Sequence, residues 1–372
     1  MGYIKNKKVC CWDLEGPIST IDFAADIGKL LSKKPELSLQ KYDMGEFFLM
    51  ISNYDDYLID TPGVKEMLKI SEYQPGDTLR IMAPLYIACY SESELLDLAH
   101  KDLGLLPGCE ELMKILHEEW DIFVISTSYT QFAHTITGAL SIPKDHVYCT
   151  EINIDRLKKD VDDIESSVNF LVRTIFEKYL ENNKDLESVI EDLNSFFWKN
   201  EESDYIRVMN KIKVRGGKRK EEAVEDISSR TNVSISKMTA LGDSITDINM
   251  LQRLKDEGGV AISFNGNNFT ISRATIAITT PNNLGVLPLF QSIDNIEKFL
   301  SDWEEKYPEF CNDANEIPND LISRKCKQYF IKYNFIPQID NLKNKSNDQL
   351  EEIIKKQILM RKILRGWAGN LG

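Results

Sequence analysis

Short apolar runs bounded by polar or turn residues recur along the chain and predict buried β-strands. Five such runs lie at residues 8–12, 121–125, 238–241, 260–264 and 274–279. They are short and lack a regular alternation of apolar and polar positions, as expected for strands that are covered on both faces of a sheet. Helical patterns lie between them, for example the spacing of Leu112, Ile115 and Leu116. Strands that alternate with helices predict an α/β fold with a parallel, doubly wound sheet.

Two long stretches depart from this alternation, and we expect both to be helical insertions. Residues 20–103 have apolar positions at helical spacing, interrupted by turn signals such as Gln74-Pro75-Gly76-Asp77. They lie between the first two predicted strands, where a cap over the carboxyl edge of the sheet would emerge. Residues 155–212 are helical and highly charged, and we expect them to pack as an added helical element.

These patterns predict one α/β domain with additions. The predicted core comprises residues 1–19 and 104–302, and the second insertion lies within it. Residues 20–103 form the predicted cap. Residues 303–372, which are charged and helical in pattern, form a C-terminal tail.

Composition narrows the class of function. The chain has 372 residues, of which 42% are hydrophobic and 28% are charged, as in ordinary globular proteins. Lys and Arg number 45 against 59 Asp and Glu, a net charge of −14. An acidic surface repels phosphate backbones, so we expect no nucleic-acid partner. An anionic substrate would also require a group that reverses this field locally.

The sequence predicts no membrane insertion and a cytoplasmic location. No apolar run approaches the roughly 20 residues of a membrane span, and the N-terminus lacks the apolar segment of a secretory signal. The seven cysteines show no Cys-x-x-Cys pair and no clustering with histidine. We therefore expect reduced thiols rather than disulfides or a zinc site.

Residues capable of chemistry follow the predicted strands directly. The first strand leads into DLEGP at 13–17, the second into Ser126-Thr127, and the third into GDSITD at 242–247. A turn at 216–220, GGKRK, opens a helix before the third strand. Ligands of open parallel sheets bind beyond the carboxyl ends of the strands. We therefore expect carboxylates, a hydroxyl and a lysine to converge at one edge.

This set resembles the motifs of the haloacid dehalogenase (HAD) superfamily of hydrolases and phosphotransferases. That pattern is DxDG after the first strand, Ser or Thr after the second, Lys at a helix start, and GDxxxD after a later strand. DLEG, IST, the lysines of GGKRK, and GDSITD correspond to it. The resemblance covers roughly residues 7–19 and 103–290. It implies a three-layer, Rossmann-like core with a parallel sheet, a helical cap and the second helical insertion.

The resemblance also implies a nucleophile and a metal site. Asp13 would attack phosphorus and form an acyl-phosphate that water then opens. Mg²⁺ prefers oxygen ligands. Asp13, the backbone carbonyl of Glu15 and Asp243 would supply them, and Asp247 would complete or orient that set. A divalent cation among four carboxylates would also reverse the local field that the net charge creates.

Several roles in the resemblance have alternatives. Ser126 would donate a hydrogen bond to a phosphate oxygen, with Thr127 as the fallback. Lys220 would pair with the nucleophile and the phosphoryl group, with Lys218 as the alternative. Glu15 stands where most HAD phosphatases carry an Asp that acts as general acid. It would be either the acid–base residue or a structural or substrate-selecting group.

More narrowly, the chain resembles an archaeal HAD-like family that opens with DxEGP. Its members are described as subunit R of energy-converting hydrogenase A, which implies hydrogenase-associated contacts. The segments that carry this likeness are DLEGPIS, NYDDYL at 53–58, VISTSYTQF at 124–132, FNGN at 264–267 and the terminal LRGWAGNLG. In NYDDYL, Asp55 and Asp56 are expected in an exposed turn; the alternative is a substrate-facing part of the cap.

The leading functional hypothesis is a Mg²⁺-dependent hydrolase of a small phosphorylated metabolite. Phosphotransfer to an alcohol is a close variant, because another nucleophile can open the same aspartyl-phosphate. The other class is a non-catalytic, HAD-like accessory subunit of a hydrogenase complex. Homo-oligomeric contacts are also compatible with the sequence. No spacing within residues 20–103 indicates which substrate the protein takes.

Overall fold

The computed structural model of the chain describes residues 7–160, 164–199 and 203–371. Within these residues a seven-stranded sheet has the order β3-β2-β1-β4-β5-β6-β7. The strands are β1 Lys8–Trp12, β2 Trp120–Tyr129, β3 Val147–Thr150, β4 Met238–Gly242, β5 Val260–Phe264, β6 Ile276–Thr279 and β7 Gln338–Asn341. Strands β1 to β6 pair in parallel, and β7 is antiparallel to β6. The predicted α/β fold with a mostly parallel sheet is confirmed.

The two strands that the sequence pattern does not predict, β3 and β7, lie at the two edges of the sheet. Strand β3 is half-buried over its first two residues, and β7 consists of the mainly polar QIDN. An edge strand is covered less than a central one, so it needs no continuous apolar run. The C-terminal segment thus contributes a strand to the sheet as well as helices.

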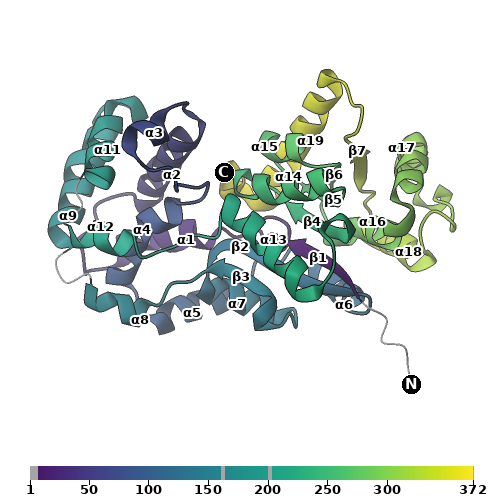
Figure 1. Cartoon of the computed structure of the whole chain (residues 1–372), viewed down its shortest axis with the longest axis horizontal. Coiled ribbons are helices and arrows are strands. Elements are labelled where there is room, and N and C mark those ends of the chain that lie inside the picture. The colour runs from purple at the N-terminus through teal and green to yellow at the C-terminus, as the bar shows by residue number, and fades with distance from the viewer. Residues whose placement is uncertain (1–6, 161–163, 200–202, 372) are drawn as a thin grey trace.

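Helices cover both faces of the sheet and give the core three layers (Figure 1). On one face, Val9 and Cys11 of β1 pack with α13 and α14. On the other face, Cys10 and Trp12 belong to an apolar cluster that includes α6, α16 and α17. The helices of this domain are α6 Cys109–Leu116, α7 Thr130–Ala139, α13 Lys218–Thr231, α14 Ile248–Glu257, α15 Asn268–Arg273, α16 Leu287–Gln291, α17 Ile296–Asn312, α18 Arg324–Tyr333 and α19 Asn347–Arg365.

Both insertions are helical, and they pack together beside the sheet domain (Figure 1). The first contains α1 Phe23–Leu30, α2 Met44–Asp60, α3 Val64–Leu68, α4 Thr78–Cys89 and α5 Glu92–Lys101. The second contains α8 Ile154–Leu157, α9 Glu165–Asn169, α10 Glu177–Glu181, α11 Ile190–Trp198 and α12 Asp204–Met209, with a π-helical turn at Phe170–Phe176. We call the part formed by α1 to α4 and α8 to α12 the helical lobe.

Buried polar contacts join the two insertions. Tyr54 of α2 donates its hydroxyl proton to Asn194 Oδ1 of α11 at 2.7 Å and accepts a hydrogen bond from Trp198 Nε1 at 2.8 Å. Tyr205 of α12 donates to the carbonyl of Ile81 in α4 at 2.7 Å. The helical lobe is therefore one packed unit built from two separate chain segments. Among the described residues, no helix has the length and apolarity needed to cross a bilayer.

Candidate active site

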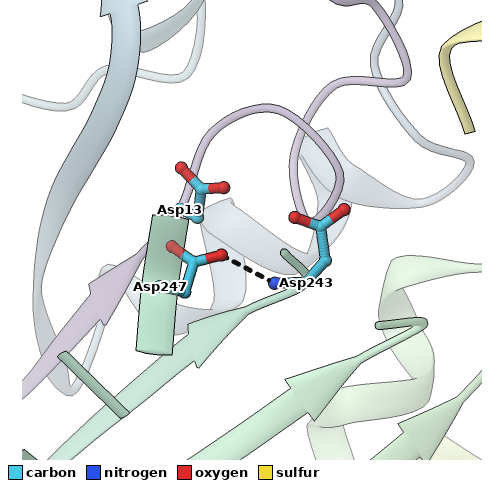
Figure 2. A group of neighbouring side chains, drawn as sticks. All are labelled: Asp13, Asp243 and Asp247. Carbon is cyan, nitrogen blue, oxygen red and sulfur yellow. Dashed lines mark hydrogen bonds between the residues drawn. The ribbon is translucent and has the colours of Figure 1, made fainter. Parts of the chain in front are cut away.

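The carboxyl edge of the sheet brings Asp13, Asp243 and Asp247 together (Figure 2). Asp13 follows β1, and Asp243 follows β4, the neighbouring strand. The backbone N–H of Asp13 donates to the Leu241 carbonyl at 2.9 Å, so the two loops leave the sheet side by side. One oxygen of each carboxylate lies within 4.8 Å of the others, and all three residues are buried. The structure thus brings together the three aspartates that the motifs predict.

Asp247 holds the GDSITD loop in shape. Its Oδ2 accepts a hydrogen bond from the backbone N–H of Asp243 at 2.9 Å (Figure 2). It also accepts one from the backbone N–H of Ser244 at 3.0 Å. Its Oδ1 accepts from Lys220 Nζ at 2.6 Å. Since both oxygens are occupied by these bonds, Asp247 is placed to orient its neighbours.

Lys220 joins Asp13 to Asp247. It is fully buried in the first turn of α13 and donates to Asp13 Oδ1 at 2.8 Å as well as to Asp247. Burial disfavours its charge, but the two carboxylates outweigh that effect and raise its pKa, so the ammonium stays protonated. Lys218 is exposed. Of the two candidate lysines, Lys220 is the one that contacts the carboxylates.

A clamp from the helical lobe fixes the start of α13. Arg219 donates to the buried Asp77 Oδ1 at 2.7 Å, and the Lys218 backbone N–H donates to Gln74 Oε1 at 3.1 Å. At Gly216 there is room for no side chain, because a Cβ would overlap the Pro75 carbonyl. The turn at 74–77 therefore sets where Lys220 enters the site.

Asp13 sits in an environment that resists its ionisation. Burial and then the Asp247 carboxylate raise its pKa to about 6, while Lys220 opposes the rise. Its Oδ1 also accepts from the Leu14 backbone N–H at 2.8 Å. The positive charge beside Asp13 is therefore what favours its ionised form.

Glu15 connects the loop after β1 to the helical lobe. Its Oε1 accepts from the backbone N–H of Phe23, the first residue of α1, at 3.1 Å. Burial and the Asp22 carboxylate raise the pKa of Glu15 to about 8. A carboxyl group that is protonated near neutral pH has the property of a general acid, and the bond to α1 is a structural role. The geometry is compatible with both.

The loops after β1 and β4 approach so closely that one position requires glycine. Gly16 has a φ of 120°, and a Cβ there would overlap the Asp243 carboxylate. The glycine of DLEG is thus needed both for the left-handed backbone and for the contact between the loops.

The two hydroxyl candidates after β2 differ in direction. Thr127 lines a cavity with Asp13 and Glu15. Ser126 is fully buried, and its Oγ accepts from the Ser128 backbone N–H at 3.0 Å. The fallback residue of the sequence analysis, Thr127, is therefore the one that faces the cavity.

That cavity, of about 80 Å³, lies between the sheet edge and the helical lobe. The lobe contributes Ser52, Asp55 and Asp56 of α2 and Thr78 of α4. The expectation of an exposed turn at Asp55 and Asp56 is wrong. Both lie within α2, because Tyr54 and Leu58 are buried on one side of that helix and leave the aspartates on the side that lines the cavity.

Asp55 is buried and hydrogen-bonded within the helical lobe. It accepts from the Tyr73 hydroxyl at 2.5 Å and from the Gly76 backbone N–H at 3.3 Å. Burial raises its pKa to about 7, against the effect of the Tyr73 bond. Asp56, which is less buried, has its pKa raised to about 6 by burial and by Asp60.

The acidic cluster fits a hard divalent cation. Asp243 Oδ1 is buried and has no hydrogen-bond partner among the described residues. An orphaned carboxylate oxygen beside two further carboxylates is a donor set that Mg²⁺ prefers. Asp13 and Asp243 would be direct ligands, with Asp247 orienting them.

Sequence reasoning missed two arginines. Arg361 of α19 forms an ion pair with Asp243 Oδ2, and Arg365 Nη1 donates to the same oxygen at 3.1 Å. Arg365 lies in the terminal LRGWAGNLG, which carries only the family likeness, and Arg361 lies one helical turn before it. No strand end or motif spacing placed these residues near Asp243.

Comparison with known proteins supports the architecture. Residues 109–289 match the family model for haloacid dehalogenase-like hydrolases. Over this segment the chain is similar to haloacid dehalogenase-like hydrolases. A search of curated protein sequences finds no significant match. The narrower likeness to hydrogenase-associated archaeal proteins is not confirmed by these comparisons.

One solved structure shows the same fold over nearly the whole chain, and others are similar over part of it. A gene product from Archaeoglobus fulgidus is similar at 22% identity with a TM-score of 0.67, covering 98% of this chain and 99% of that one. A substrate-bound phosphoserine phosphatase is similar at 14% identity with a TM-score of 0.46, covering 76% of this chain and 98% of that one. The first of these shows that the core, the helical lobe and the C-terminal segment recur together as one fold.

Proposed function

We propose that this protein is a Mg²⁺-dependent phosphomonoester hydrolase that acts on a small phosphorylated metabolite. The observation that carries the proposal is the setting of Asp13. Its carboxylate lines the cavity, is hydrogen-bonded to the buried Lys220, and lies beside the orphaned Asp243 Oδ1. A carboxylate paired with a lysine next to a cation site is arranged for attack on phosphorus.

In this reaction Asp13 displaces the alcohol from the phosphoryl group and forms an aspartyl-phosphate. Lys220 neutralises charge on Asp13 and on the phosphoryl oxygens, and Thr127 donates a hydrogen bond to one of those oxygens. When bound at Asp13 and Asp243, Mg²⁺ would neutralise charge on the transferring group.

Glu15 acts first as the general acid and then as the general base. In its protonated form it gives the proton to the departing alkoxide, and its carboxylate then takes a proton from the water that opens the aspartyl-phosphate. The second step restores Asp13 and releases inorganic phosphate. An alcohol in place of that water would give the phosphotransfer variant. The cytoplasmic location and any hydrogenase-associated or homo-oligomeric contacts stay predictions from the sequence.

Phosphate release from a panel of phosphomonoesters tests the proposal. The panel contains p-nitrophenyl phosphate, sugar phosphates and phosphorylated hydroxy acids, each with Mg²⁺ or with EDTA. We expect turnover with Mg²⁺ only, and a loss of about 10³-fold or more in kcat for Asp13→Asn. Asp97→Asn, an exposed Asp of α5, is the matched control and should behave as wild type. Turnover by Asp13→Asn at the wild-type rate, or none by wild type on any ester, would reject the proposal.

A further inference from the structure

Three polar residues on one face of helix α19 lie along the carboxyl edge of the sheet. Gln357, Arg361 and Arg365 are four residues apart and so share one face of the helix. Gln357 Oε1 accepts from Ser263 Oγ at 2.8 Å and from the Gly266 backbone N–H at 2.7 Å, which ties the helix to the end of β5. One and two turns further on, Arg361 and Arg365 reach the end of β4 and line the cavity with Asp13.

The turn after α19 locks Arg361 in place. Its Nε donates to the Gly369 carbonyl at 3.3 Å and its Nη2 to the Leu371 carbonyl at 2.8 Å. Gly366, with a φ of 56°, reverses the chain so that these carbonyls face the guanidinium. Since Nη1 is bound to Asp243, each nitrogen of Arg361 has a partner, and the residue serves as a fixed support.

Arg365 has spare hydrogen-bonding capacity in the same cavity. Its side chain is 5% exposed, and it donates to Asp243 Oδ2 from Nη1 and to the Thr20 carbonyl from Nε at 3.4 Å. Its Nη2 makes no hydrogen bond with the described part of the chain. A buried guanidinium with a free donor is able to bind a ligand anion.

Arg365 lies near the loop after β1. Its Nε donates to the Thr20 carbonyl, and Glu15 and Asp22 line the same cavity as Arg365. Lys220, in contrast, is bonded to Asp13 and Asp247. The two cations therefore serve different ends of a bound ester: Lys220 the phosphoryl group, and Arg365 the alcohol that Glu15 protonates.

The charge balance points the same way. Seven carboxyl groups line this cavity or belong to the acidic cluster beside it. They are Asp13, Glu15, Asp22, Asp55, Asp56, Asp243 and Asp247. An ester with an additional negative group would be repelled by that set. Arg361 is fully bound to Asp243 and to two backbone carbonyls, so the free donor of Arg365 is the group that offsets this repulsion for an acidic ester.

We propose that Arg365, supported by Arg361 and the turn at 366–371, binds a second acidic group of the substrate. The substrate class is then a phosphate monoester whose alcohol carries a carboxylate or a second phosphate. This inference rests on the proposed phosphatase function and adds the substrate class to it.

The test compares two esters that differ in one acidic group, 3-phosphoglycerate and glycerol 3-phosphate. The quantity measured is the ratio of their kcat/KM values with full-length protein and Mg²⁺. We expect wild type to favour the acidic ester and Arg365→Gln to lower the ratio by about 10- to 100-fold. Arg365→Lys should retain part of the ratio. Lys362→Gln removes an exposed charge on the same turn and should keep the wild-type ratio.

Binding to a variant without turnover gives an independent readout. Calorimetry with 3-phosphoglycerate should show weaker affinity for Asp13→Asn/Arg365→Gln than for Asp13→Asn. A wild-type ratio of one or less, or a ratio unchanged in Arg365→Gln, would overturn the inference while leaving the phosphatase function intact. Should Arg365→Gln fail to fold by circular dichroism, the same comparison is decided with Arg365→Lys. If no ester, including p-nitrophenyl phosphate, is turned over, the proposed function fails, and the calorimetric comparison still decides whether Arg365 binds the acidic group.

Discussion

The two groups of charged residues at the sheet edge reach it by different routes. Asp13, Asp243 and Asp247 lie directly after neighbouring strands, and Lys220 opens a helix packed on that sheet. The arginines come instead from α19, a helix near the end of the chain. The first route follows from topology alone, because adjacent parallel strands end at one edge. The second depends on α19, and no local sequence pattern indicates where that helix packs.

The difference has an energetic side. Carboxylate oxygens that lie within 4.8 Å repel one another by about 3 kcal/mol a pair at an effective dielectric of about 20. Residues placed by the strands therefore create an unfavourable field, and residues placed by α13 and α19 offset it. The motif residues after the strands thus place the carboxylates of the site, and the helices α13 and α19 supply the positive charges that offset their repulsion.

Removal of Lys220 should have the largest effect. Lys220→Met leaves Asp13 and Asp247 buried without their shared cation, so we expect a loss of about 3 to 5 kcal/mol in the free energy of unfolding. Turnover should be lost as well. Urea unfolding measures the first effect, with the exposed Lys218→Met as control. An unchanged urea midpoint in Lys220→Met would show that the carboxylates do not need this cation.

Removal of Arg361 should have a smaller effect on stability, and that effect should depend on Asp243. Arg361→Met removes an ion pair with Asp243 and the bonds to the Gly369 and Leu371 carbonyls, which we expect to cost about 2 kcal/mol. In a double-mutant cycle with Asp243→Asn, the two changes should be non-additive by about 1 to 2 kcal/mol. Additive effects on the free energy of unfolding would mean that Arg361 and Asp243 do not stabilise each other. Lys362→Met is the exposed control.

Asp55 is a buried acid that is not paired with a lysine as Asp13 is, and its effect on stability depends on pH. Asp55 forms no ion pair within the part of the chain that the structure describes, and burial raises its pKa from 3.8 to about 7. The folded state therefore binds the Asp55 proton more tightly than the unfolded state. The contribution of Asp55 to stability is fully present below a pH of about 3.8 and is lost as the pH rises through about 7.

Asp55→Asn keeps the size of the side chain and removes this titration. Thermal unfolding of wild type and variant between pH 4 and 7 should show a smaller decline in the variant, with the gap closing at low pH. Asp97→Asn provides the exposed control. Parallel curves for wild type and Asp55→Asn across the range would mean that Asp55 is ionised in the folded protein.

The sequence predicted most of the sheet and the aspartates, since both depend on local signals. Buried central strands leave apolar runs, and the loops after them carry the motif residues. It could not predict β3 and β7, which are edge strands with polar positions. Nor does the local pattern show which of Lys218 and Lys220 contacts the carboxylates or which of Ser126 and Thr127 lines the cavity, because both depend on how α13 and β2 present each side chain. The arginines were missed because their position depends on the packing of α19 through Gln357.

The distances along the chain between the residues of this site have a consequence for folding. Lys220 and Asp13 are 207 residues apart, and Arg365 and the Thr20 carbonyl are 345 apart. Contacts that close long loops form late, because the chain must lose the entropy of the loop before the contact can stabilise it. Since the contact of α19 closes the longer of these two loops, we expect α19 to dock after Lys220 and Asp13 have come together. In that intermediate the carboxylates repel one another with Lys220 as their main counter-charge, so salt should stabilise it by screening. The last step of folding is then also the step that completes the charge balance at Asp243.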